Sequence, residues 1–137
     1  MSSSPIEQLL ASFDSLDVEA ALALFAPDGR LLTVDGRRAV GTDQIKQLIE
    51  SFLSQLRSTT HRITSLWQEA DVWIAECEGS YELKDDLLIR DLPRAVIARF
   101  GSDGLTDVRV YGAHERELSE HHIDTGMWVG GRWVPPL

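Results

Sequence analysis

The sequence predicts an α+β domain in which three N-terminal helices pack on a curved, mainly antiparallel sheet. The length of 137 residues is close to the modal size of one domain. Apolar residues recur mostly with a helical period as far as Arg57, and with the strand period of two beyond it. Helices followed by a run of strands are typical of this fold class. We therefore expect residues 1–137 to form one domain, with a core of about residues 5–116 and a C-terminal tail of residues 117–137.

The first two helices are predicted from their capping residues and their apolar spacing. Ser4, Pro5 and Glu7 form a helix start in which Ser4 and Glu7 complete a capping box. Asp17 is placed to cap a second helix, which we expect Pro27 to end. The apolar faces are Ile6, Leu9, Leu10 and Phe13 in the first helix, and Val18, Ala21, Leu22 and Phe25 in the second.

A short hairpin separates these helices from the third one. Residues 30–34 and 37–40 are predicted strands, joined by Asp35-Gly36, which is a strong signal for a two-residue turn. Gly41-Thr42 then opens a longer helix, which we expect to reach about Arg57. Its apolar stripe consists of Ile45, Leu48, Ile49, Phe52 and Leu56.

The second half of the chain predicts a meander of long strands over residues 59–67, 72–83, 87–100 and 105–114. One face of the second strand is apolar and carries Trp73, Ala75, Cys77, Gly79, Tyr81 and Leu83. Pro93 predicts a bulge or a break in the third strand, because proline cannot donate a ladder hydrogen bond. Long strands curl, and a curled sheet closed by helices leaves a cavity of the kind that binds small ligands.

The C-terminal tail is predicted to contain a small hairpin over residues 127–134. A turn at Gly130-Gly131 would set Trp128 opposite Trp133. This hairpin would cover the mouth of the cavity, the sheet or a partner chain. Residues 114–124 are predicted to be a solvated acidic segment without metal, because their histidines lack the spacing of metal ligands.

The charge balance excludes several classes of partner. With 13 Lys and Arg against 22 Asp and Glu, the formal net charge is -9, which argues against binding to nucleic acid or to anionic membranes. No apolar run is long enough to span a bilayer, and the N-terminus does not resemble a signal peptide. Cys77 is the single cysteine, so we expect a cytoplasmic protein in a reducing compartment.

Four short segments carry a resemblance to a known superfamily. They are DSLD at residues 14–17 before ALALFA, the Asp35-Gly36 turn, GTDQI at 41–45 and THRI at 60–63. In this order they resemble the nuclear transport factor two-like superfamily, in particular its SnoaL-like and scytalone dehydratase-like branches. The resemblance implies a cone-shaped, cystatin-like roll and a homodimer formed through the outer face of the sheet.

Two chemistries found in this superfamily lack their residues here. The ketosteroid isomerase pattern would place Leu9 and Val96 where a tyrosine and an aspartic acid hold the oxyanion, although Asp35 lies close to the position of the base. An apolar pair cannot stabilise an enolate. The limonene epoxide hydrolase pattern is also absent, with Gly79, Tyr81 and Val110 at its Arg and Asp positions.

The dehydratase pattern is retained in part. The resemblance implies His61 as the acid/base and Asp14 as the carboxylate that orients it. Histidine exchanges protons near neutral pH, and a buried carboxylate fixes its tautomer. The tyrosine beside the aspartate is replaced by Phe13, and the second histidine falls near Tyr81 or Glu82. Tyr81 would then supply a hydroxyl instead.

Structural interpretations of the same residues stay open. Asp14 lies between two helices, where aspartate commonly caps, and Asp35 precedes a glycine in a turn. His61 begins a strand, where a lone histidine is often only hydrogen-bonded. Arg109 and Tyr111 share one face of the last long strand, which is either a polar lining of the pocket or an outer surface.

Two function classes follow from these residues. The first is a lyase or isomerase without a cofactor that uses His61, Asp14 and Tyr81 on a small apolar or cyclic organic ligand. The second is a non-catalytic ligand-binding or dimeric assembly module of the same fold. In either class, the expected ligand-binding residues are Phe13, Asp35, Trp67, Val96, Arg109, Tyr111 and Trp128.

Overall fold

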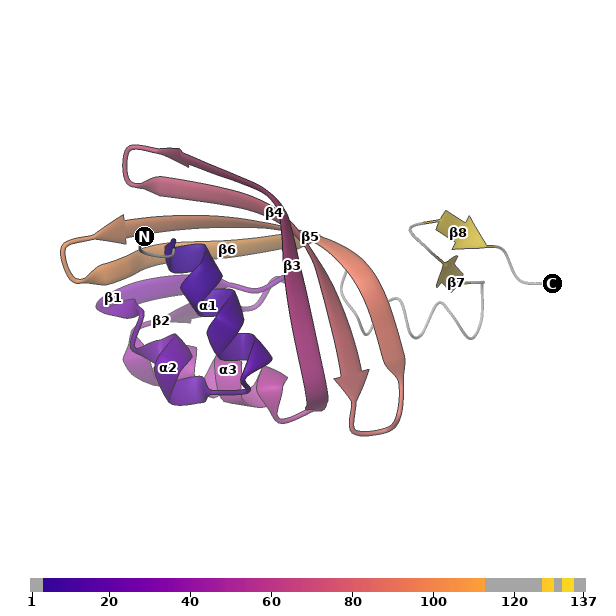
Figure 1. Cartoon of the computed structure of the whole chain (residues 1–137). Helices are drawn as coiled ribbons and strands as arrows, with labels where there is room; N and C mark the ends of the chain where they lie inside the picture. The colour runs from indigo at the N-terminus through magenta and orange to yellow at the C-terminus, as the bar shows by residue number, and fades with distance from the viewer. Residues whose placement is uncertain (1–3, 113–126, 130–131, 135–137) are drawn as a thin grey trace.

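The computed structural model describes residues 4–112, together with the backbone of residues 127–129 and 132–134. Three helices cover one face of a curved sheet of six strands (Figure 1). The helices are α1 (Pro5–Asp14), α2 (Val18–Leu22) and α3 (Thr42–Leu53). The strands are β1 (Phe25–Leu32), β2 (Arg38–Val40), β3 (Leu56–Glu69), β4 (Val72–Leu83), β5 (Leu88–Gly101) and β6 (Gly104–Gly112). The predicted α+β class is confirmed.

The sheet is mixed, with the strand order β2-β1-β6-β5-β4-β3. Strands β1 and β6 are parallel, and the other neighbours are antiparallel. The sheet is therefore mainly antiparallel, as predicted. Its long strands β3, β4 and β5 bend around the helices (Figure 1).

The predicted caps of the first two helices are confirmed. The backbone N–H of Glu7 donates to Ser4 Oγ at 3.1 Å, and the Ser4 N–H donates to Glu7 Oε1 at 3.0 Å. Asp17 Oδ1 accepts from the Ala20 N–H at 3.0 Å at the start of α2. These bonds satisfy amide groups that have no partner inside their helices.

The predicted ends of the second and third helices are wrong. Helix α2 ends at Leu22, and Phe25 opens β1 as a buried strand residue beside Leu105. Helix α3 ends at Leu53, while Leu56 lies opposite Leu83 as the first residue of β3. Phe25 and Leu56 are both buried, and a buried apolar residue fits a helix or a strand. Pairing with a neighbouring strand places both residues in the sheet.

The irregularity predicted at Pro93 lies just before that residue. Strand β5 continues through Pro93, which lies opposite Glu78. The register shifts where Gly79 and Tyr81 of β4 face Leu92 and Ile89 of β5. This shift is a bulge, and such bulges commonly lie next to functional sites and re-aim side chains.

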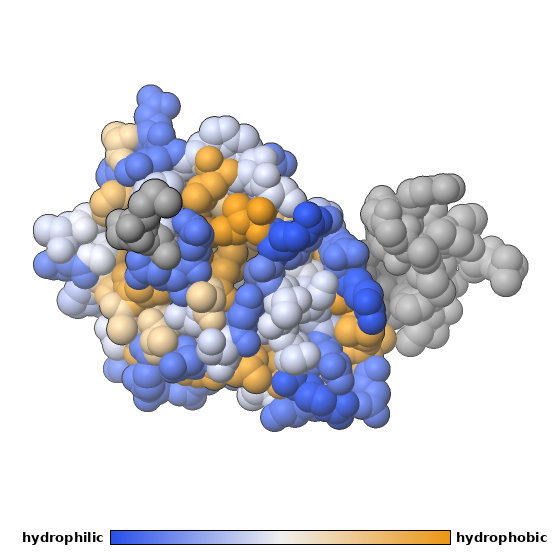
Figure 2. Space-filling model, viewed as in Figure 1, coloured by the Kyte–Doolittle hydropathy of each residue, from blue (hydrophilic) through white to orange (hydrophobic). Residues whose placement is uncertain are grey.

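The core lies between the helices and the inner face of the sheet. Ile6 of α1, Ile45 and Ile49 of α3, Leu105 and Val108 of β6 are its largest fully buried side chains. On the face of the molecule drawn in Figure 2, hydrophobic residues are exposed mainly where the helices meet the sheet. Hydrophilic residues surround much of the periphery of this face. Among the described residues, no helix has both the length and the apolar composition needed to cross a lipid bilayer.

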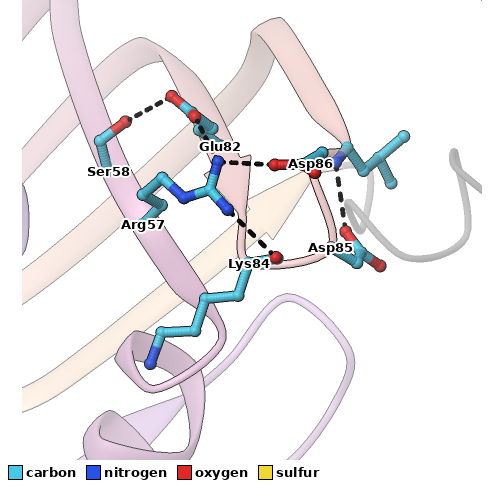
Figure 3. A network of polar contacts seen from close by, with 7 residues as sticks. Arg57, Ser58, Glu82, Lys84, Asp85 and Asp86 are labelled. Carbon is cyan, nitrogen blue, oxygen red and sulfur yellow. Dashed lines mark hydrogen bonds and ion pairs between the residues drawn. The ribbon is translucent and has the colours of Figure 1, made fainter.

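Arg57 at the start of β3 binds the turn between β4 and β5 (Figure 3). Its Nη1 lies 3.1 Å from Glu82 Oε1 and 2.6 Å from Asp86 Oδ1, and its Nη2 donates to the Lys84 carbonyl at 3.3 Å. The hydrogen bonds to Asp86 and Glu82 raise the pKa of Arg57. This network joins the ends of the two strands that carry the site described below.

The predicted C-terminal hairpin is present as strands β7 (Met127–Val129) and β8 (Arg132–Val134). Their register places the backbone of Trp128 opposite that of Trp133, as predicted. The acidic segment of residues 114–124 lies outside the described residues.

Candidate functional site

A cavity of about 90 Å³ lies between the helices and the inner face of the sheet. Its wall is mostly apolar, and includes Leu9 and Phe13 of α1, Phe52 of α3, Cys77 of β4, Val96 of β5 and Val108 of β6. The polar side chains in the wall are Thr33, Asp35, Arg37, His61, Tyr81 and Arg94. A few polar groups in a mainly apolar cavity are typical of a small-molecule site.

Asp14, His61 and Tyr81 form a continuous hydrogen-bonded chain at this cavity. His61 Nδ1 lies 2.6 Å from Asp14 Oδ1, and the His61 backbone N–H donates to Asp14 Oδ2 at 3.1 Å. His61 Nε2 lies 3.0 Å from the Tyr81 hydroxyl oxygen. The side chain of His61 is 5% exposed and Tyr81 is 2% exposed, so water is largely excluded from these two groups, whereas the side chain of Asp14 is 29% exposed.

The donors and acceptors in this chain follow from the chemistry of its groups. An ionised carboxylate only accepts hydrogen bonds, so the Nδ1–H group of His61 donates a hydrogen bond to Asp14. In neutral histidine the other nitrogen is an acceptor, so Nε2 accepts a hydrogen bond from the Tyr81 hydroxyl group. The order resembles a nucleophile–histidine–carboxylate triad, with a tyrosine hydroxyl in the first place.

The structure explains why Asp14 stands at the end of α1. A negative charge there is unfavourable, because the carboxyl end of a helix carries a partial negative charge. Capping of the next helix falls to Asp17, while both oxygens of Asp14 contact His61, 47 residues along the chain. Tertiary contact with His61 therefore offsets the local cost.

Gly79 makes room for the Tyr81 hydroxyl. His61 of β3 lies opposite Gly79 of β4, and Tyr81 lies two residues further along β4. A Cβ atom at position 79 would lie 2.3 Å from the Tyr81 hydroxyl oxygen and 2.7 Å from its Cζ. The tyrosine side chain thus lies over the glycine to reach the histidine, and no larger residue fits without moving it.

Aromatic rings hold Tyr81 from the helix side. The ring of Phe52 meets the Tyr81 ring edge-on with centroids 5.9 Å apart, and Phe13 contacts Phe52 at 6.0 Å. The His61 and Tyr81 rings are also nearly perpendicular, at 5.5 Å. Phe13, which replaces the tyrosine of the dehydratase pattern, therefore supports the site by packing.

Two further groups of the wall have altered acidity. Burial of the Asp35 carboxyl alone would raise its pKa, but hydrogen bonds from Thr33 and Arg37, with the Arg37 charge, lower the pKa overall. Burial raises the pKa of the Cys77 thiol, which opposes formation of a nucleophilic thiolate. Cys77 therefore acts here as a small apolar wall residue.

Several predicted ligand-binding residues do line the cavity. Phe13 and Val96 lie in its apolar wall, and Asp35 lies at its exposed rim beside Arg37. Asp35 Oδ2 accepts from Arg37 Nε at 2.7 Å, so this carboxylate also serves the turn, as its position before Gly36 indicated.

Three other predicted residues lie outside the wall of this cavity. Trp67 is 50% exposed on β3, and Tyr111 is 42% exposed on β6, with Arg109 beside it. On β6, Val108 and Val110 face the cavity, so Arg109 and Tyr111 point to the outer face by alternation. The side chain of Trp128 lies outside the described residues.

The sequence interpretation missed Arg94. Its side chain lines the cavity, it is only 8% exposed, and its Cζ lies 5.4 Å from the centroid of the Tyr81 ring. The available signal was alternation along β5, where Arg94 shares a face with Leu92 and Val96. An arginine in an otherwise apolar row is unusual, because arginine is seldom buried unless it is paired.

Comparison with solved structures gives the fold relatives. A protein with a ketosteroid isomerase-like fold from Catenulispora acidiphila, in complex with trimethylamine, is 18% identical with a TM-score of 0.77, covering 87% of this chain and 92% of the other. TerC, co-crystallised with polyporic acid, is 14% identical with a TM-score of 0.71, covering 86% and 93%. A candidate SnoaL-like polyketide cyclase from Shewanella denitrificans is 10% identical with a TM-score of 0.71, covering 85% and 92%. At these identities the likeness shows the fold.

Sequence comparison gives the family. No curated protein matches the chain. The SnoaL-like domain family matches residues 6–129, a range that includes α2, α3, the six-stranded sheet and every polar residue of the cavity wall. On this match the chain belongs to the SnoaL-like domain family.

Proposed function

We propose that this protein is a lyase or isomerase of the dehydratase or cyclase type, and that its substrate is a small cyclic organic molecule. Side chains of the protein serve as the acid and the base. The single observation that supports the proposal most is the chain from Asp14 through His61 to the Tyr81 hydroxyl, with contacts of 2.6 and 3.0 Å at a mainly apolar cavity. A carboxylate at one nitrogen and a hydroxyl at the other is the arrangement that proton transfer through a histidine requires.

In the proposed reaction, one proton is removed from a carbon of the substrate and one proton is given to the leaving hydroxyl group. As the Tyr81 oxygen takes a proton from a carbon next to a carbonyl group, the Tyr81 hydroxyl proton passes to His61 Nε2. Asp14 stabilises the imidazolium that results. The electron pair left on carbon forms a double bond as a neighbouring hydroxyl leaves, and the reverse movement gives that hydroxyl its proton. The products are one water and an unsaturated ketone, and return of the proton to a different carbon would give isomerisation instead.

The size and polarity of the cavity suggest the substrate class. A volume of about 90 Å³ with few polar groups suits one small ring, with any larger part of the substrate projecting past the rim at Asp35 and Arg37. The solved structure of TerC, co-crystallised with polyporic acid, supports a small organic ligand in this fold. The alternative is a module that binds the same ligand without turnover.

A proton-exchange experiment separates these two functions. 2-Tetralone in D₂O reports enolisation by loss of its C1 proton signals, and 3-hydroxycyclohexanone reports dehydration by formation of cyclohexenone. We expect the protein to accelerate at least one reaction, and His61→Gln to reduce that acceleration by roughly 10²-fold or more. Tyr81→Phe should reduce it similarly. No acceleration of either probe, or full rate in both variants, would leave the binding module as the better account.

A further inference from the structure

We propose that Ser80 and Asp91 are positioning residues for the Tyr81 hydroxyl. The hydrogen bond between them fixes a bulge in β5, and this bulge holds Tyr81 in the orientation that reaches His61. The inference rests on the proposed function, because it concerns the same proton-handling groups. It extends that function to two residues that do not belong to the cavity wall.

The bulge is one extra residue in β5. Two residues of β5, Arg90 and Asp91, lie between ladder pairs that enclose only Ser80 on β4. The flanking pairs are Gly79 with Leu92 and Tyr81 with Ile89. The bulge therefore lies directly beside the segment of β4 that carries the tyrosine of the site.

The bulge decides which residue of β5 lies beside Tyr81. In a ladder without the extra residue, pairing one against one from Leu92 would bring Arg90 opposite Tyr81. By alternation, Arg90 would then share the inner face of the sheet with Leu92. With the bulge, Arg90 is exposed, and Ile89 lies opposite Tyr81 and packs against the core. Ile89 carries no polar group that could compete with His61 for the tyrosine hydroxyl.

A hydrogen bond between side chain and backbone holds the bulge. The Asp91 N–H donates to Ser80 Oγ at 3.1 Å. The extra residue of a bulge loses its place in the ladder, so its amide needs another acceptor. Asp91 also has φ +55, a left-handed conformation that aspartate adopts more readily than most residues other than glycine. The pair thus provides a residue that tolerates positive φ and an acceptor for its amide.

Ser80 transmits the geometry of the bulge to Tyr81, because it is the residue between Gly79 and Tyr81. The hydroxyl lies so close over Gly79 that a Cβ atom there would be 2.3 Å from it, and the Phe52 ring packs edge-on against the tyrosine ring. This packing leaves the side chain little freedom to compensate for a change in backbone direction. The hydroxyl is also the far end of the side chain, so a small rotation at Ser80 would move it away from His61 Nε2, now at 3.0 Å.

Nitrogen NMR of the histidine-labelled whole chain tests the inference without turnover. The chemical shift of His61 Nε2 reports whether this nitrogen accepts a hydrogen bond, His61→Gln assigns the signal, and Tyr81→Phe gives its position without the tyrosine donor. In Ser80→Ala, we expect the signal to move towards the Tyr81→Phe position. In Ser80→Thr, which keeps the hydroxyl, it should stay in place. No movement in Ser80→Ala, or equal movement in Ser80→Thr, would overturn the inference.

Thr64→Ala is the matched control, because Thr64 lies at another irregularity of the sheet. The register of β3 against β4 shifts between Ile63 and Ser65, and Thr64 Oγ1 donates to the Glu76 carbonyl at 3.1 Å. The variant therefore removes a hydroxyl from a second bulge, away from Tyr81, and should leave the His61 signal in place. A shift as large as that in Ser80→Ala would contradict a specific role of the Ser80 hydroxyl.

The backbone of Asp91 is tested by two further variants. Asp91→Gly keeps the amide and permits positive φ, so the His61 signal should stay in place. Asp91→Val disfavours positive φ and should move the signal as Ser80→Ala does. A shift in Asp91→Gly would assign the effect to the carboxylate and contradict the inference, and this variant remains informative if Asp91→Val does not fold.

Kinetics then connect the bulge to the proposed reaction. On whichever probe the unchanged protein turns over, Ser80→Ala should lower kcat about tenfold or more and change KM little, because the cavity wall is intact. A raised KM with unchanged kcat would contradict a positioning role. Because the NMR measurement involves no substrate, it can succeed or fail independently of the proton-exchange experiment on His61 and Tyr81.

Discussion

At the scale of single residues, the absence of a side chain at position 79 matters as much as any group present. Gly79→Ala places a methyl group where the Tyr81 hydroxyl oxygen now lies, with only 2.3 Å between the two atoms. We expect the hydroxyl to leave His61, so proton exchange should fall to the level of Tyr81→Phe. Overpacking should lower the free energy of unfolding by about 1–3 kcal/mol.

Deuterium exchange from 2-tetralone and thermal unfolding check this prediction together. Gly101→Ala is the control, because a Cβ at position 101 meets Thr106 Cγ2 at an ordinary 3.4 Å and its backbone is not in the left-handed region. Normal exchange in Gly79→Ala would show that the tyrosine hydroxyl has no part in the chemistry.

The carboxylate of Asp14 gives a second prediction at this scale. Asp14→Asn keeps the size of the side chain but removes the charge that stabilises the imidazolium and fixes the tautomer of His61. We expect a loss of activity of roughly 10²-fold or more, measured on whichever probe the unchanged protein turns over. Asp17→Asn is the matched control, because asparagine caps α2 as well as aspartate does. Full activity in Asp14→Asn would restrict Asp14 to a structural role.

At the scale of elements, the turn between β1 and β2 depends on the charge of Asp35. Thr33 and Arg37 donate to this carboxylate, and their contacts hold its pKa below the ordinary value of 3.8. A pKa that is lower in the folded protein means that the stabilisation is fully present above about pH 4. It is lost as the pH falls through the pKa of the folded state.

Asp35→Asn should therefore weaken the dependence of stability on pH in the acid range. We expect the variant to be less stable than the unchanged protein at pH 7, by a few tenths of a kcal/mol for such an exposed pair, with the difference shrinking below pH 4. Urea unfolding at pH 7, 5 and 3 measures it. A difference that grows towards low pH would have the wrong sign for this explanation.

The limits of prediction from sequence also appear at the scale of elements. The caps at Ser4 and Asp17 were predicted because their signals lie within one helical turn. The placement of Phe25 and Leu56 was wrong, because a buried apolar side chain fits a helix and a strand equally well until its partner strand is known. Most of the sheet was predicted from alternation, but the parallel pairing of β1 with β6 has no local signal.

The residues of the candidate site also differ in how far the sequence alone predicts them. Asp14 and His61 came from the resemblance to a family, because no spacing rule joins residues 47 positions apart. Tyr81 was predicted on the apolar face of its strand, whereas its contact with His61 depends on the register opposite Gly79. Arg94 shares the buried face of β5 with Leu92 and Val96, and only alternation along this strand indicates its inward position.

At the scale of the whole molecule, the outer face of the sheet carries the prediction of a dimer. The cross-strand pairing places Trp67 beside Ile74, Ile74 beside Ile97, and Ile97 beside Arg109. Trp67 is 50% exposed and Ile74 is 39% exposed, so part of this row presents apolar surface to solvent. Contiguous exposed apolar surface often marks an interface between proteins.

We expect a homodimer that Trp67→Glu converts to a monomer, because a buried unpaired charge opposes association. Light scattering coupled to size-exclusion chromatography measures the mass directly. Val40→Glu is the control, since Val40 is 53% exposed on β2, away from this row. A monomeric mass for the unchanged protein at micromolar concentration would contradict the prediction.

The distribution of the cavity wall over the fold has a consequence for how such a protein can evolve. The hydrogen-bonded chain comes from α1, β3 and β4, whereas Arg94, Val96 and Val108 come from β5 and β6. Under the proposed function, substitutions at Val96 and Val108 would change which molecule is accepted while Asp14, His61 and Tyr81 keep their geometry. A single scaffold can diversify its repertoire of substrates in this way without having to reinvent its chemistry, and the same separation gives the protein engineer two nearly independent sets of positions to vary.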